Sequence, residues 1–212
     1  MASLFSQNNS GDVLMWDMGD FASKLVRMRK SGKGLEVVEY KMVAHGDADI
    51  ATNMESVAQE MKEMRECQVS LMVPSSISKT RVVQEERTRK IGSSRISSYE
   101  EKAILESCMV AARKILAEEW KVSGIPAQEL TFPCCETSNM VVDGYAVPRL
   151  QGFQGTRIQV GVLVVGMPVA YAERIEQFFK RGMIKRYQVV CEAQMMRRFA
   201  KRAMLSGIYG DV

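Results

Sequence analysis

The sequence predicts an α+β fold, because strand and helix patterns follow one another in a mixed order. A β-α-β pattern lies between about residues 35 and 74, and a long helical pattern begins at residue 98. A β-meander with a central apolar strand comes next, and a pair of helical patterns closes the chain. This order favours a single α+β domain with packed helices.

The length and composition fit a globular protein with a real core. The chain has 212 residues, of which 46% are hydrophobic and 25% charged. Such a length suits one domain. We expect a flexible tail over residues 1–12 and one α+β domain over residues 13–212. The tail lacks the basic and apolar regions of a secretory signal.

The cysteines indicate where the protein works. They are odd in number and scattered, which favours a reducing, intracellular compartment. We expect the cytoplasm, with the nucleus as the alternative. The five are Cys67, Cys108, Cys134, Cys135 and Cys191.

The first third of the chain contains four predicted elements. Residues 20–34 resemble a short helix that ends at two glycines, and residues 35–43 are rich in β-branched and aromatic side chains, as in a strand. A helix follows from about residue 50, with apolar positions at helical spacing up to Met64. Residues 68–74 alternate as in a half-buried strand. We expect the strands at 35–43 and 68–74 to be parallel, joined by a right-handed crossover.

The next segment changes character. Residues 75–98 are dominated by serine and charged side chains, which predicts a linker or exposed basic arm with a frayed helix around 80–90. Ser98 and Glu101 form a capping box that opens a helix to about residue 121. Its predicted buried stripe consists of Ile104, Cys108, Ala111 and Ile115, extended by Trp120.

The second half begins with strands. The pair Asp143-Gly144 lies between apolar residues and predicts a hairpin. Residues 156–165 form the most apolar strand, which we expect at the centre of the sheet. Helices are predicted at about 168–181 and 184–205, separated near Gly182.

The stretch at residues 161–179 invites three interpretations. Its apolar run is too short for a membrane helix, and Gly166 and Pro168 interrupt it. Gly161 and Gly166 have the outer spacing of a phosphate-binding loop, but the Lys and Ser/Thr of that motif are missing. We therefore expect a structural role, with a tight turn at Gly166 and Pro168 at the first helical position.

Metal and catalytic sites receive little support. Cys134 and Cys135 are adjacent, which is poor spacing for chelating one ion, and His45 is the single histidine. His45 follows a strand and suits a turn better than a general base. We predict no catalytic residue, no metal and no cofactor, and hence a protein that is not an enzyme. An enzyme whose site is not visible in linear motifs is the alternative.

The basic residues carry the functional prediction. The net charge is +4, and residues 171–212 hold nine Lys or Arg against four Asp or Glu. On a helical wheel of residues 184–205 the arginines gather opposite an apolar side. Arginine clusters suit phosphate contacts. The candidate nucleic-acid-binding residues are Lys79, Arg81, Arg87, Arg89, Lys90, Arg95, Lys180, Arg181, Lys185, Arg186, Arg197, Arg198, Lys201 and Arg202.

These patterns lead to a first functional hypothesis. It is a non-enzymatic nucleic-acid-associated protein of structural or accessory type, with RNA favoured over DNA and a viral origin as a guess. It would form a homo-oligomer. An anionic membrane surface is a weaker candidate partner for the same basic helix. The alternative function is an oligomeric assembly or matrix-type scaffold that acts through protein–protein and membrane-surface contacts.

Overall fold

The computed structural model describes residues 12–31, 34–45, 50–60, 67–190 and 194–195. The described chain contains two β-sheets and three α-helices, so the α+β prediction is confirmed. The expectation of one domain from residue 13 onward stays a prediction, and within the chain the contacts gather into two compact units. The first unit comprises residues 1–76 and 171–192, and the second comprises residues 77–170 and 193–212.

The first unit contains a five-stranded sheet in the order β3-β2-β1-β4-β9. The neighbours among β1, β2 and β3 are antiparallel, whereas β4 pairs in parallel with both β1 and β9. The strands predicted at 35–43 and 68–74 are confirmed and run in the same direction, but β2 and β1 lie between them. The strands are β1 (Val13–Met18), β2 (Ala22–Ser31), β3 (Gly34–Ala44), β4 (Gln68–Met72) and β9 (Tyr187–Val190).

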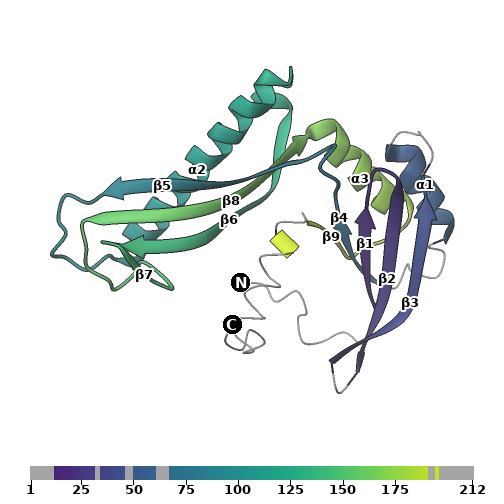
Figure 1. Cartoon of the computed structure of the whole chain (residues 1–212), viewed down its shortest axis with the longest axis horizontal. Helices are drawn as coiled ribbons and strands as arrows, with labels where there is room; N and C mark the ends of the chain where they lie inside the picture. Colours follow the sequence, from purple (N-terminus) through teal and green to yellow (C-terminus); the bar gives the residue numbers. More distant parts are fainter. Residues whose placement is uncertain (1–11, 32–33, 46–49, 61–66, 191–193, 196–212) are drawn as a thin grey trace, which may run out of the picture. The chain divides into compact units, whose positions relative to one another are not determined.

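Helices α1 (Ile50–Glu60) and α3 (Val169–Arg181) accompany this sheet (Figure 1). Both had been predicted from helical spacing. Phe178 and Phe179 of α3 meet the ring of Trp16 edge to face, with centroids 5.5 and 6.4 Å apart. Phe179 also stacks on Tyr187 at 4.1 Å. These aromatic contacts place α3 on the sheet face that carries Trp16.

The second unit contains a four-stranded antiparallel sheet in the order β5-β8-β6-β7. Its strands are β5 (Lys79–Thr88), β6 (Leu130–Val142), β7 (Tyr145–Ala146) and β8 (Arg157–Pro168). The long helix α2 (Ser98–Val122) runs along this sheet, and a 3₁₀-helix (Ala127–Glu129) precedes β6 (Figure 1). The apolar strand predicted at 156–165 is therefore the core of β8, and its central position is confirmed.

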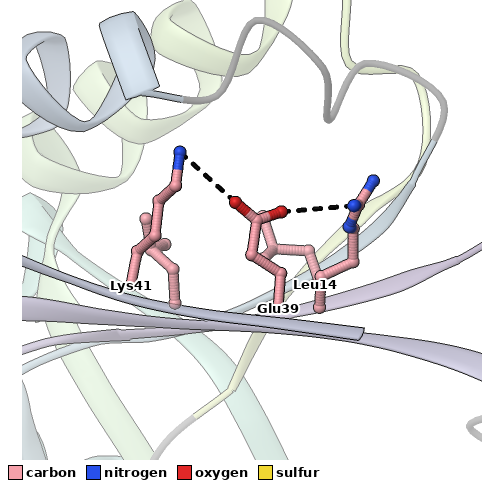
Figure 2. Close-up of a pocket in the computed structure, with 5 residues that line it drawn as sticks. Leu14, Glu39 and Lys41 are labelled. Atoms are coloured by element: carbon pink, nitrogen blue, oxygen red, sulfur yellow. Dashed lines mark ion pairs between the residues drawn. The ribbon is translucent and has the colours of Figure 1, made fainter. Parts of the chain in front are cut away.

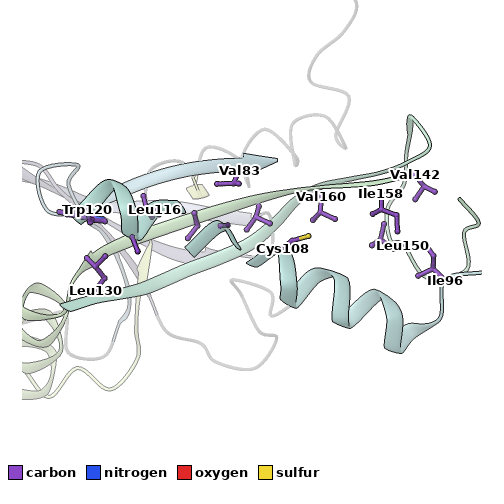
Figure 3. Close-up of a cluster of buried hydrophobic side chains, with 14 residues drawn as sticks. Val83, Ile96, Cys108, Leu116, Trp120, Leu130, Val142, Leu150, Ile158 and Val160 are labelled. Atoms are coloured by element: carbon purple, nitrogen blue, oxygen red, sulfur yellow. The ribbon is translucent and has the colours of Figure 1, made fainter. Parts of the chain in front are cut away.

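The core of the second unit forms where α2 covers the sheet. The helix contributes Cys108 and Leu116, and β8 contributes alternate valines such as Val160 and Val162 (Figure 3). The predicted stripe of α2 is shifted by one residue at two points, because Ala112 and Leu116 are buried while Ile115 is exposed. The helix cap is shifted likewise: the Ser97 hydroxyl, not that of Ser98, accepts the Glu100 amide.

Three predictions of secondary structure are wrong. Residues 22–31 are a strand, because β2 is paired on both edges and alternates inward at Ser23 and Leu25. The predicted linker or arm at 75–98 contains β5, which pairs with β8 along its whole length. A helix does not begin at 184, because residues 187–190 pair with β4. The rest of the predicted helix lies mostly outside the described residues.

Two turn predictions have opposite outcomes. The hairpin at Asp143-Gly144 is confirmed, and both residues have positive φ angles of 48° and 89°. Gly166, by contrast, lies inside β8 and makes no turn. A Cβ at this glycine would meet Leu116 at 3.1 Å and Phe132 at 3.3 Å. The lack of a side chain at Gly166 therefore allows α2 to pack closely on β8.

Candidate functional site

Most of the predicted nucleic-acid-binding residues that the structure describes in the second unit form hydrogen bonds or ion pairs with neighbouring residues. Arg89 is buried, with 9% of its surface exposed. Its Nε and Nη2 donate to the two carboxylate oxygens of Glu100 at 2.6 and 2.9 Å, and its Nη1 donates to the carbonyls of Ser94 and Gly155. These hydrogen bonds hold the pKa of the Glu100 carboxyl below its usual value. Arg89 is thus a structural cation that fixes the start of α2.

Two cations of β5 itself also bind within the unit. The Nε of Arg81 donates to both carboxylate oxygens of Glu119 at 2.7 and 2.9 Å, which raises the Arg81 pKa. Lys79 donates to the Ser123 hydroxyl at 2.7 Å and lies 4.5 Å from the centre of the Trp120 ring. These contacts tie β5 to the C-terminal half of α2.

The remaining predicted residues lie partly in the second unit, partly in the first unit and partly outside the described residues. Arg87 pairs with Glu85 at 3.3 Å and donates to Ser107, while Lys90 and Arg95 are exposed on the loop that follows β5. In the first unit Lys180 pairs with Glu176 at 2.6 Å, and its pKa is raised by that carboxylate. Exposed side chains there also include Arg181, Lys185 and Arg186. The last four candidates, Arg197, Arg198, Lys201 and Arg202, lie outside the described residues.

His45 sits at the end of β3 and takes part in a buried polar chain. The Trp16 Nε1 donates to the Ser23 hydroxyl at 2.7 Å, and this hydroxyl lies 3.0 Å from the His45 Nε2. Burial lowers the pKa of His45. Ser23 is fully buried, so no substrate reaches it and the Ser–His pair does not form an accessible nucleophile.

The described part of the chain contains no cluster of metal ligands and no activated thiol. No three His, Cys, Asp or Glu residues gather there in a way that could hold a metal ion. Cys108 and Cys135 are free thiols, and burial raises the pKa of Cys108. The expectation that the protein is not an enzyme stays a prediction.

The most distinctive surface lies on β3, at one end of the first sheet. Within the described residues no strand pairs with its outer edge. One face of the strand, which we call the apolar face, carries Leu35, Val37, Tyr40 and Met42, which are 44, 61, 59 and 65% exposed. Large apolar side chains are rarely so exposed in a row. The combination of an open edge and an apolar row is typical of a binding site.

The apolar face continues onto the neighbouring strands. In the register of the sheet Tyr40 lies opposite Val26, which lies opposite Met15. Val37 begins a second such row, through Met28 to Val13. The residues on β2 and β1 in both rows are half-buried. The row of Met42 differs, because it runs to Lys24 and Asp17, which form an ion pair. The candidate surface therefore consists of two apolar rows beside a charged pair, with its most exposed apolar side chains at the edge.

The opposite face of β3 is polar. Glu39 receives Arg27 Nη2 at 3.2 Å and Lys41 Nζ at 3.3 Å. Together with Leu14 and Leu25 these three charged residues line a shallow hollow (Figure 2). Arg27 also lies 3.8 Å from Asp12, so the two cations are matched by two carboxylates. The two faces of the edge strand β3 thus differ: one is apolar, and the other carries ion pairs of balanced charge.

Sequence reasoning identified the strand at 35–43 but did not identify it as a site. The signal was present, because apolar residues at 35, 37, 40 and 42 are interrupted by charges at 36, 39 and 41. What the sequence does not reveal is that β3 is the last strand of the sheet among the described residues. An inner strand with this pattern would carry no exposed row.

Comparisons with known proteins identify the fold. No protein-family profile and no curated protein sequence matches the chain. A solved structure described as a PilM-PilN type IV pilus biogenesis complex is similar, with a TM-score of 0.52 and 17% identity over 84% of this chain. The match covers 46% of the chain in that structure, so this protein spans about half of its length.

A second similarity is weaker. The cytoplasmic domain of EpsL, an inner membrane component of the type II secretion system of Vibrio cholerae, matches with a TM-score of 0.46 and 12% identity. That match covers 84% of this chain and 56% of the other. We draw no inference from it.

The pilus similarity corrects the functional prediction. The hypothesis of an RNA-binding, viral structural protein is wrong, since the fold is similar to part of a chain in a pilus biogenesis complex. The predicted partners, which were nucleic acid, further copies of the chain and a membrane surface, are corrected on the same ground. The contacts of Arg81 and Arg89 explain the error, because these guanidinium groups hold carboxylates rather than phosphates.

None of the described helices has the length and apolar character of a membrane-spanning helix.

Proposed function

We propose that the protein binds a partner protein as a component of an assembly of the type IV pilus kind. The observation that carries the proposal is the shared fold with a chain of the PilM-PilN complex, over 84% of the present chain. In that structure the named proteins form a complex with each other. A protein of this fold that acts by holding another protein needs an exposed binding surface.

The exposed apolar row on β3 supports this proposal. Apolar side chains at protein interfaces lose their contact with water on binding, which contributes about 25 cal/mol for each Å² that is buried. Tyr40 and Met42 have most of their surface available for such burial. Aromatic residues and methionine are also the types enriched in interfaces.

We place this function in the cytoplasm. The free thiols of Cys108 and Cys135 support that location, because disulfides are rare in a reducing compartment.

Pairwise binding tests this function. The purified protein is titrated by calorimetry with each soluble segment of the pilus and secretion proteins of its source organism. We expect one segment to form a 1:1 complex. The proposal is overturned if no segment binds at about 100 µM, a concentration at which even weak complexes are visible.

A further inference from the structure

We propose that the partner binds by adding an extended strand to the outer edge of β3, with apolar side chains at alternate positions. This inference rests on the proposed function and specifies how the partner is held. Strand addition is a common mode of peptide recognition. It uses backbone hydrogen bonds for affinity and alternate side chains for specificity.

The hydrogen bonding of β2 and β3 shows which backbone groups face outward. The His45 amide donates to the carbonyl of Phe21 at 2.7 Å. The neighbouring carbonyl of Ala22 faces the other way and accepts the Gly19 amide at 3.1 Å. In an antiparallel pair, residues alternate between bonding to the partner strand and pointing away from it. Ala44, which lies opposite Ala22, therefore directs its amide and carbonyl away from β2.

The same alternation continues along β3. Val43 and Lys41 bond to β2, whereas Met42 and Tyr40 direct their amides and carbonyls to the open edge. The residues with outward backbone groups are thus the ones whose side chains lie on the apolar face. A strand added at this edge would form hydrogen bonds with Tyr40, Met42 and Ala44, and it would make apolar contacts with the side chains of the same three residues.

This geometry defines the chemistry of the partner segment. It must be extended and free of proline at the bonded positions, because each bonded residue donates an amide hydrogen. Its apolar residues lie beside Tyr40 and Met42, and the one beside Tyr40 lengthens the row that runs through Val26 to Met15.

The polar face adds a charge preference. Glu36 is exposed on this face and lies opposite Arg29, whose guanidinium donates to both carboxylate oxygens of Asp12. A Lys or Arg of the added strand next to Glu36 is therefore favoured, with polar residues elsewhere on that side. The inferred partner segment alternates apolar residues with polar, partly basic ones.

A labelled peptide tests the inference. The probe is a fluorescein-labelled nonapeptide in which valine alternates with lysine or threonine, and its binding to the whole protein is followed by fluorescence anisotropy. We expect saturable binding that weakens at least tenfold in Tyr40→Lys and in Met42→Lys. Phe21→Lys is the control, because Phe21 is 84% exposed in the same unit but lies in the turn between β1 and β2. All three variants should keep the wild-type Tm, since exposed side chains contribute little to stability.

Methylated peptides test the backbone contacts directly. One peptide carries N-methyl groups on its valine amides and the other carries them on the alternate amides. Because only alternate amides of a strand face one edge, we expect one peptide to lose binding and the other to keep it. Equal binding by both peptides would overturn the inference, as would unchanged binding in both β3 variants.

The outcomes separate this inference from the proposed function. If a pilus or secretion protein binds equally well to wild type and Tyr40→Lys, the function stands and the β3 edge is the wrong surface. If the probe does not bind and sedimentation shows that wild type, but not Tyr40→Lys, self-associates, the edge pairs with a second copy and the inference is wrong.

Discussion

Arg89 and Glu100 form a bidentate ion pair that joins the loop after β5 to the first turn of α2, with hydrogen bonds of 2.6 and 2.9 Å. We predict that Arg89→Met lowers the free energy of unfolding by about 2 kcal/mol, because hydrogen bonds to charged groups contribute about 1.5–3 kcal/mol. Urea unfolding measures the loss. The matched control is Lys90→Met, an exposed neighbour that should change stability by less than about 0.5 kcal/mol.

The same pair predicts an acid dependence. The pKa of Glu100 is lowered in the folded protein, so its contribution is complete above the unfolded value of 4.5 and disappears as the pH falls through the folded pKa. The stability difference between wild type and Arg89→Met should therefore shrink below pH 4.5. A difference that stayed constant down to pH 3 would show that Glu100 is not held by Arg89.

His45 gives a second, separate dependence on pH. Its pKa lies below 6.5 in the folded protein because burial disfavours the imidazolium. The unfolded chain then takes up the proton first, so stability decreases as the pH falls from 6.5 toward the folded pKa. His45 is the single histidine, so its NMR titration is read without overlap. A midpoint at or above 6.5 would contradict the partly buried environment of the ring.

Gly166 is predicted to resist substitution. The new methyl group in Gly166→Ala would lie 3.1 Å from Leu116 Cδ2 and 3.4 Å from Trp120 Nε1, which is tighter than ordinary packing. We expect a loss of about 1 kcal/mol from this overpacking. Thermal unfolding measures it, with an alanine substitution at an exposed site, Val110→Ala, as the comparison. Stabilisation by Gly166→Ala would mean that α2 packs less closely on β8 than described.

Much of the fold could be predicted because its signals are local. The apolar run of β8 and the Asp143-Gly144 hairpin each lie within a few residues of sequence. β2 was misjudged because Leu25 and Met28 also have helical spacing, and pairing with strands on both edges decides the outcome. Such pairing depends on residues far away in the chain.

The candidate site was missed for the same physical reason. The sequence shows arginines but not their partners, and Glu119 lies 38 positions after Arg81. An ion pair over that separation forms only when α2 packs on β5. Likewise, the apolar row through Tyr40 becomes a surface only because β3 lies at the end of the sheet that the described strands form.

The central claim is that a partner strand adds to the outer edge of β3. Amide hydrogen exchange, measured by NMR with and without a saturating amount of the nonapeptide, tests it residue by residue. We predict slower exchange at Tyr40, Met42 and Ala44, and unchanged exchange at Lys41 and Val43, whose amides already face β2. Unchanged exchange at the first three amides, with protection elsewhere in the protein, would contradict the account.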